Sequence, residues 1–289
     1  MEGSEYLSPR ALGRAVGLSE SSVRRWADDG RLRAERTAGG HRRIARAEAV
    51  RFIRETGLEL VRPDLLGFVA PDSERDDELL AAEVLLDALR SADSLRARRM
   101  LVSAFLDGAP LASLCDGPIR RALRDLGVHG PQEPEAAVHE HHAVDVCLHA
   151  LMEIRSAIPE RGGAPVALGG AVEGDPYLLP SVMASVVLAD AGFRAFNLGP
   201  DVPSAVLLAG VRVYAPVLVW RSATILGAGR AIASERRSIG RLPSDHRPEL
   251  VVGGRGASPV ELRRAGGVQR LSSMAELAGF ARAFLAQRD

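Results

Sequence analysis

Two short basic segments near the start of the sequence carry side chains suited to binding a polyanion. The first, residues 19–26, reads Ser-Glu-Ser-Ser-Val-Arg-Arg-Trp. On a helix, residues three and four apart are neighbours, which separates an apolar face with Val23 and Trp26 from a polar face. Hydroxyl and guanidinium groups contact phosphates and base edges in the major groove. We therefore expect the apolar pair in a core and a DNA-reading face formed by Ser21, Ser22, Arg24 and Arg25.

The second segment, residues 36–44, concentrates three arginines and a histidine around the pair Gly39 and Gly40. Glycine adopts the positive φ that tight hairpin turns require, so we expect a β-hairpin over about residues 32–44. Such a hairpin lays guanidinium groups beside a phosphate backbone. The alternative is a solvated basic hairpin without a partner. The predicted DNA contacts on the hairpin are Arg36, Thr37, His41, Arg42 and Arg43.

The elements that must position these side chains carry clear end signals. Ser8 and Pro9 supply an N-cap and a first-turn proline for a helix that Gly17 ends, and Ser19 caps a second helix to about residue 29. A further helix is expected over about residues 46–55. The order helix, turn, helix, hairpin, helix predicts a winged helix-turn-helix domain over residues 1–57.

Charge and composition limit the function classes. The chain has 37 basic and 37 acidic residues, but residues 1–55 hold twelve arginines against eight acidic residues. This local excess favours a nucleic-acid partner for that part of the chain. Cys115 and Cys147 lack CxxC spacing, which argues against a zinc site or a disulfide framework. The start lacks the order of a secretory signal and no apolar run reaches about 18 residues, so we expect a cytoplasmic protein without a membrane partner.

The rest of the sequence predicts two further domains. In residues 76–158, apolar residues recur at spacings of three and four, which predicts a four-helix bundle. In residues 164–289, short β-branched runs alternate with helical segments, which predicts a doubly wound, Rossmann-like parallel sheet. The expected strands are 166–170, 194–198, 217–220 and 250–252, and the expected helices are 178–191, 204–213, 228–239, 259–265 and 274–286.

Residues 7–55 resemble the DNA-binding domain of MerR-type transcriptional regulators. The resemblance rests on the Thr-x-Gly-Gly-His-Arg-Arg pattern of residues 37–43 and on a Val-Arg-Arg-Trp helix with Gly30 four residues later. It implies a homodimer or homotetramer that binds a pseudo-palindromic operator in double-stranded DNA, with the second helix in the major groove.

The order of domains resembles the light-responsive, cobalamin-binding repressors of the same superfamily (CarH/LitR type), over nearly the whole chain. Residues 198–203 resemble a strand-to-helix turn of that family, Ser222 stands where the family has a serine that contacts the cofactor tail, and Gly253 with Gly254 matches its glycine pair. The resemblance implies a repressor.

The cobalamin loop departs from the family pattern. The family has Asp/Glu-x-His-x-x-Gly, whose imidazole ligates cobalt, whereas residues 175–180 read Asp-Pro-Tyr-Leu-Leu-Pro. A phenol with a pKa of about 10 is a poor neutral ligand for cobalt. We therefore expect no cofactor. The alternative is a sensor that is switched by cobalamin in another mode, or by another small ligand, a protein partner or a metal. The candidate ligand-binding residues are His129, Glu140, His141, Asp175, Tyr177, Ser222, Gly253 and Gly254.

Other functions find less support. The spacing of His139, His142, Asp145 and His149 on one predicted helix suits a metal, but exposed histidines beside a bundle are the commoner outcome, and we expect no metal site. Residues 169–174 resemble a phosphate loop only faintly, and a chain without lysine has no P-loop lysine. We expect no enzyme. An accessory unit of a methyltransferase or mutase, which binds a corrin without acting on DNA, is a third hypothesis that the hairpin motif opposes.

Overall fold

The computed structural model describes residues 5–68, 82–127, 134–160, 162–256, 258–259, 262 and 268–288. The chain forms two compact units, Met1–Pro159 and Glu160–Asp289. Among the residues described, no helix is long and apolar enough to cross a membrane.

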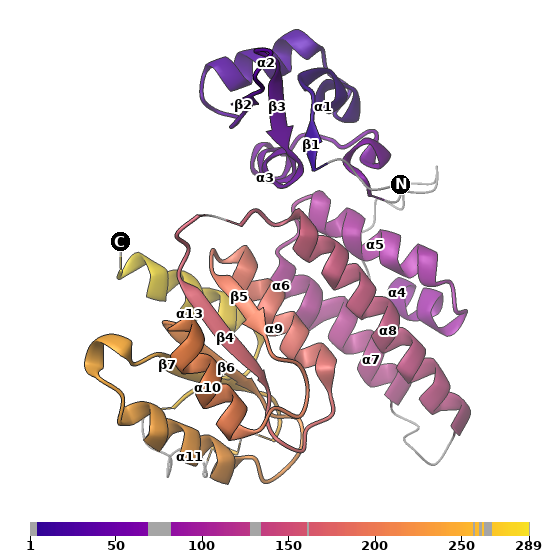
Figure 1. The fold of residues 1–289 in the computed structure, drawn as a ribbon. Coiled ribbons are helices and arrows are strands. Elements are labelled where there is room, and N and C mark those ends of the chain that lie inside the picture. Colours follow the sequence, from indigo (N-terminus) through magenta and orange to yellow (C-terminus); the bar gives the residue numbers. More distant parts are fainter. Residues whose placement is uncertain are drawn as a thin grey trace. The chain divides into compact units, whose positions relative to one another are not determined.

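Residues 5–68, here called the N-terminal segment, contain three helices and a small antiparallel sheet (Figure 1). The sheet has the strand order β1-β3-β2. Its third strand pairs with both neighbours, so that Leu7 lies opposite Ile44 and Arg36 opposite Arg42. The elements are β1 (Tyr6–Leu7), α1 (Pro9–Ala15), α2 (Glu20–Asp28), β2 (Glu35–Arg36), β3 (Arg42–Ala45), α3 (Arg46–Thr56) and the short 3-10 helix η1 (Pro63–Leu66).

Capping residues explain where these helices begin and end. The Ser8 hydroxyl accepts a hydrogen bond from the amide of Ala11, and the Ser19 hydroxyl accepts one from the amide of Ser22. Each bond satisfies an amide that has no partner within its helix. At the other end of the segment, Gly57 follows α3 with a left-handed φ of 64°, a conformation that glycine adopts without strain. Strand β1 was not predicted, because two residues carry no periodic pattern.

The second part of unit 1 is a helical bundle, formed by α4 to α8. Buried apolar side chains, among them Leu85, Leu101 and Leu151, fill the space between its helices. Both cysteines are buried there, and burial raises the pKa of the Cys147 thiol to about 12. The described helices are α4 (Ala82–Arg90), α5 (Ser94–Leu106), α6 (Leu111–Leu114), a π-helical turn (Cys115–Ile119), α7 (Arg120–Leu126) and α8 (Pro134–Ala157).

Unit 2 is built on a parallel five-stranded sheet with the order β5-β4-β6-β7-β8. The predicted doubly wound parallel sheet is therefore confirmed, whereas β8 was not predicted. Most of the helix expected over residues 259–265 lies outside the described residues. The elements are β4 (Val166–Ala171), α9 (Leu178–Asp190), β5 (Arg194–Asn197), α10 (Ser204–Tyr214), β6 (Leu218–Ser222), α11 (Gly229–Gly240), the 3-10 helix η4 (Ser244–His246), β7 (Glu249–Gly253), β8 (Gln269–Leu271) and α13 (Met274–Ala286).

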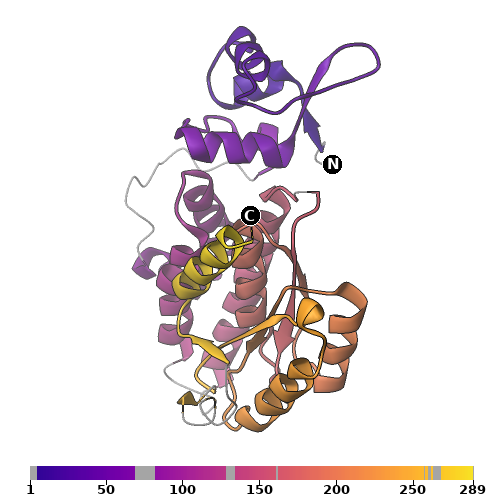
Figure 2. The ribbon, with the colours of Figure 1, turned by 90° about the vertical axis from the view of Figure 1, so that its left-hand side faces the viewer.

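Helices cover both faces of this sheet. Helix α9 packs against α13, and α10 packs against α11. Figure 2 shows α13 in yellow and α11 in orange on different sides of the strands. Between the sheet and the α10/α11 pair lies an apolar core with Leu168, Val219 and Ile232, each with no exposed surface. The alternation of side chains along β6 sends Trp220 to the opposite face, where a Cβ on Gly169 would overlap its indole ring.

The backbone conformation and a close contact within the chain require a glycine at position 254. Its φ is 100°, and a Cβ built there would overlap the carbonyl oxygen of Ala223. Gly279 lies on the exposed surface of α13, with nothing near the position of a Cβ. The two sites therefore make a matched pair for the same substitution.

We expect Gly254→Ala to lower the free energy of unfolding of unit 2 by about 2 kcal/mol or more, because it adds backbone strain and a steric overlap. Gly279→Ala should raise it by up to about 1 kcal/mol, since alanine favours a helix. Urea unfolding followed by Trp220 fluorescence in a Trp26→Phe background measures both. Equal effects of the two substitutions would contradict this account.

Candidate functional site

Helix α2 presents its polar face to solvent, as the pattern predicted. Val23 has no exposed surface, and the Trp26 ring lies 5.0 Å from that of Phe52, so both apolar residues pack inward. The hydroxyl oxygens of Ser21 and Ser22 lie 2.8 and 3.0 Å from that of Ser19. Exposed side chains on this helix include Ser21, Arg24 and Arg25, whereas Ser22 is half-buried.

The hairpin between β2 and β3 is closed by backbone hydrogen bonds at its tip. The amide of Thr37 donates to the carbonyl of His41 at 2.8 Å, and the amide of Gly40 donates to the carbonyl of Thr37 at 2.8 Å. Gly40 has a φ of 79°, whereas Gly39 does not have positive φ, so the turn needs one glycine rather than two. Residues 35–41 are exposed, and the hairpin therefore offers its charged side chains to solvent.

Carboxylates of the N-terminal segment already pair with three of the predicted contact arginines. Arg24 bonds Glu20 at 2.5 Å, one helical turn away. Arg42 pairs with Asp28, which links the hairpin to α2. Arg43 forms an ion pair with Glu35 across the hairpin, with a nitrogen-to-oxygen distance of 2.7 Å, and the hydrogen bond to Glu35 raises the pKa of Arg43. The guanidinium of Arg43 also lies 4.1 Å from the centroid of the Tyr6 ring.

Other arginines of the segment stay unpaired. Within residues 5–68, the exposed side chains of Arg25 and Arg36 form no ion pair. The sequence reasoning included these two but missed others. Arg10 and Arg14 have no acidic residue three or four positions away, which is a readable signal, whereas Arg31 has Asp28 and Glu35 at these spacings. The additional exposed arginines of residues 5–68 that form no ion pair include Arg10, Arg14 and Arg31.

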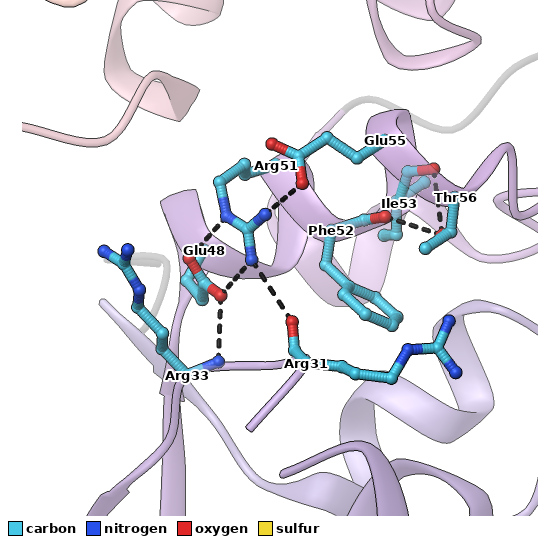
Figure 3. A network of polar contacts seen from close by, with 8 residues as sticks. All are labelled: Arg31, Arg33, Glu48, Arg51, Phe52, Ile53, Glu55 and Thr56. Carbon is cyan, nitrogen blue, oxygen red and sulfur yellow. Dashed lines mark hydrogen bonds and ion pairs between the residues drawn. The ribbon is translucent and has the colours of Figure 1, made fainter. Parts of the chain in front are cut away.

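A buried carboxylate holds the connection between α2 and β2 (Figure 3). Glu48 on α3 is 7% exposed and accepts hydrogen bonds from the Arg33 amide at 2.9 Å and from Arg51 Nε at 2.8 Å. Burial alone would raise the pKa of Glu48, but the hydrogen bonds from Arg51 and Arg33 outweigh it and the pKa is lowered. Arg51 also reaches the carbonyl of Arg31 at 3.5 Å and pairs with Glu55.

In unit 2, the loops that follow β4, β5 and β6 meet at the carboxyl ends of the strands. The strand order reverses between β4 and β6, and open parallel sheets bind ligands in the crevice at such a point. Asp175 has no exposed surface, and its carboxylate accepts hydrogen bonds from the amides of Thr224 at 2.5 Å and Tyr177 at 3.1 Å. Asp201 accepts one from the amide of Gly174 at 2.6 Å. These carboxylates tie the three loops together.

The predicted ligand-binding residues of unit 2 differ in their exposure and in their contacts. Tyr177 is the N-cap residue of α9 and is 48% exposed. Ser222 ends β6 and is 6% exposed, and its hydroxyl has no hydrogen-bond partner. Gly254 leaves room for the backbone of Ala223, and a Cβ on Gly253 would lie 3.4 Å from the Leu271 carbonyl. The glycine pair thus serves the packing of the chain and gives no independent sign of a ligand.

Of the bundle residues in that set, the structure describes Glu140 and His141. His129 lies outside the described residues. Glu140 is half-buried near Gly127, and His141 is exposed. His142 Nε2 lies 2.9 Å from the Ser94 hydroxyl, and His149 Nδ1 lies 2.9 Å from the carbonyl oxygen of Asp145. Among the residues described, no three His, Cys, Asp or Glu side chains are grouped so that they could hold a metal ion.

A buried ion pair that the sequence reasoning missed joins β6 to α11. Arg221 on β6 and Glu235 on α11 are 3.0 Å apart, and neither side chain is exposed. Arg221 also donates to the carbonyl of Val202 at 2.8 Å, and the Ser204 hydroxyl donates to Glu235 at 2.8 Å. Burial lowers the pKa of Arg221 and raises that of Glu235, and the attraction between the two charges opposes both shifts.

Comparison with known proteins finds likeness in structure only. No protein-family model matches the chain, and no curated protein is significantly similar in sequence. The monomethylamine corrinoid protein of Methanosarcina barkeri matches with a TM-score of 0.56 and 16% identity, over 70% of this chain and 96% of that chain. A cobalamin-binding protein from Desulfitobacterium hafniense DCB-2 gives 0.38 and 15%, over 73% and 98%. The methanol:cobalamin methyltransferase complex from Methanosarcina barkeri gives 0.40 and 16%, over 79% and 94%.

The first of these scores is high enough to show a shared fold. The parallel sheet of unit 2, with its helices, has a Rossmann-like fold like that of the monomethylamine corrinoid protein. This likeness to a corrinoid protein corrects the expectation that no cofactor is involved, which rested on the departures of residues 175–180 from the cobalamin loop, with Tyr177 and Pro180 in place of its histidine and glycine. Unit 2 therefore keeps the fold although the loop sequence has changed.

The buried ion pair gives a test of how unit 2 is stabilised. We expect Arg221→Met to lower the free energy of unfolding by about 3 to 5 kcal/mol, because it leaves Glu235 buried without its partner. The double variant Arg221→Met/Glu235→Met should be much closer to the parent, since both charges are removed together. Thermal and urea unfolding measure both variants. If the double variant is as unstable as the single one, the unpaired charge is not the cause.

Proposed function

We propose that the protein is a DNA-binding transcriptional regulator, with a winged helix-turn-helix domain in its N-terminal segment. The observation that supports it most is the set of exposed, unpaired guanidinium groups on α2 and the hairpin, with Arg25 and Arg36 at its centre. The helix inserts its polar face into the major groove, where Ser21 and Arg24 meet base edges. The hairpin lies against the phosphate backbone as the wing.

The internal ion pairs of this segment are compatible with DNA binding. Exposed pairs such as Arg43 with Glu35 contribute at most about 1 kcal/mol each, so a phosphate can displace the carboxylate at small cost. The unpaired arginines need no such exchange and should form the first phosphate contacts. The regulator is a homo-oligomer that binds a pseudo-palindromic operator and acts as a repressor.

Charge removal in the full chain tests the DNA contacts. We expect Arg25→Ala/Arg36→Ala to weaken binding and to reduce the slope of log affinity against log salt by roughly 2, because each lost phosphate contact removes about one unit. Fluorescence anisotropy with genomic fragments, at several salt concentrations, measures this. Arg124→Ala in α7 removes an exposed arginine from the helical bundle and should leave the slope unchanged. Equal slopes for the parent and the double variant would remove α2 and the hairpin from the interface.

We further propose that a corrinoid is the effector of this regulator and binds to unit 2. Two observations support this. Unit 2 has a fold like that of a corrinoid protein, and the buried Ser222 hydroxyl at the carboxyl edge of the sheet has no hydrogen-bond partner. The residues present fit a group held by Ser222 and the loop backbone. They do not fit ligation of cobalt by an imidazole, because position 177 is a tyrosine. Ser222 and the loop backbone would hold the group, and its cobalt would supply a metal centre that absorbs visible light.

Spectroscopy tests the effector. We expect the purified full chain, incubated with cyanocobalamin and desalted, to retain corrin absorbance close to one per chain. Tyr177→Phe should retain it equally, since the phenol is not a ligand, whereas Tyr177→His should shift the absorbance maxima, because an imidazole is a better ligand for cobalt than a phenol. Loss of all corrin on desalting would end the corrinoid proposal and leave the DNA-binding proposal intact. Corrin retention without any binding to DNA would favour the accessory-unit hypothesis.

A further inference from the structure

Helix α3 contacts two different parts of unit 1. Towards the hairpin, its residues Glu48 and Arg51 hold the amide of Arg33 and the carbonyl of Arg31 (Figure 3). These two backbone groups belong to the short connection that leads from α2 into β2. The path of the chain into the hairpin therefore depends on where α3 lies.

Towards the helical bundle, α3 is held by the guanidinium group of Arg54. Its central carbon lies 3.8 Å from the centroid of the Phe105 ring on α5, and its Nη2 donates to the carbonyl of Ala109 at 3.2 Å. Phe105 is 1% exposed, so its ring is shielded from water. Cation–π contacts are stronger when they are desolvated. Helix α3 also packs against α8 of the bundle.

The two sets of contacts lie next to each other on one rigid element. Arg51 and Arg54 are three residues apart and so are neighbours on the helix surface. A helix moves as a body, and packed interfaces change between discrete arrangements rather than deforming continuously. Any shift of the bundle that moves α3 therefore also moves the groups that hold the start of β2.

We propose that α3 transmits the state of the helical bundle to the hairpin, with Arg54 as the positioning residue on the bundle side and Glu48 on the hairpin side. As regulation of the site, this rests on the proposed function in DNA binding. The hairpin has other attachments, through the pairing of β1 with β3 and of Arg42 with Asp28, so the control is partial.

Hydrogen exchange of the full chain, without DNA, tests the coupling. Arg54→Met keeps an apolar stem against Phe105 but loses the cation–π contact and the bond to Ala109. We expect it to speed hydrogen exchange of the hairpin amides, including those of Thr37 and Gly40, by about threefold. The reason is that the lost contacts of Arg54 make local opening of the hairpin easier. Phe105→Leu should act in the same direction. Arg96→Met, on the same helix α5 but nine residues before Phe105, is the control and should leave hairpin exchange unchanged.

Combining substitutions at the two ends of the coupling decides whether they act together. We expect Glu48→Gln to speed exchange of the hairpin amides, and the double variant Glu48→Gln/Arg54→Met to add less than the sum of the two single effects. Additive effects, or unchanged hairpin exchange in both Arg54→Met and Phe105→Leu, would overturn the proposal. An equal rise in the amides of α1 would also overturn it, because it would indicate general loosening of the segment. Since no DNA is present, these outcomes are separate from failure of the DNA-binding proposal.

Discussion

The pairing of arginine with carboxylates inside the chain is the constraint on which the rest of the structure depends. Every basic residue of the sequence is arginine, and basic and acidic residues are equal in number, so the function of a guanidinium depends on whether a carboxylate lies near it. Arg221 and Arg51 are committed to buried partners and hold elements in place. Arg42 and Arg43 have exposed partners, which a phosphate can replace. Arg25 and Arg36 remain open to an external anion. A net charge of zero therefore conceals a surface with a strong local bias.

In unit 2, backbone groups rather than charged side chains shape the candidate ligand site. Asp175 and Asp201 bind loop amides, and Gly254 lets the chain after β7 approach Ala223. These interactions draw the loops together at the carboxyl edge of the sheet, which is where parallel folds place ligands. The fold thus supplies the location, and the individual residues decide the chemistry. At that location the chain offers an exposed phenol at Tyr177 and a buried hydroxyl at Ser222.

Unit 1 joins a segment with exposed charges to a bundle with an apolar interior. Helix α3 carries a buried carboxylate at Glu48 and a shielded guanidinium at Arg54, so it belongs to the packing of both parts. A polar group buried in this way is costly unless its partners are in place, which makes its geometry well defined. The arrangement gives the hairpin a position that depends on more than its own strands.

The sequence by itself determined the local elements. Ser8 and Ser19 marked helix starts, Gly17 marked a helix end, and the β-branched runs marked four of the five strands of the parallel sheet, because these signals act over a few residues. It also indicated which side chains of α2 face solvent. Only the tertiary structure decided the rest. Strands β1 and β8 are two and three residues long and exist through pairing with distant neighbours. Arg42 meets Asp28 fourteen positions away, and Arg221 meets Glu235 on another element, so spacing along the chain gave no sign of either pair. The role of Gly254 likewise follows from its contact with the backbone of Ala223, thirty-one positions earlier in the chain, which no local pattern indicates.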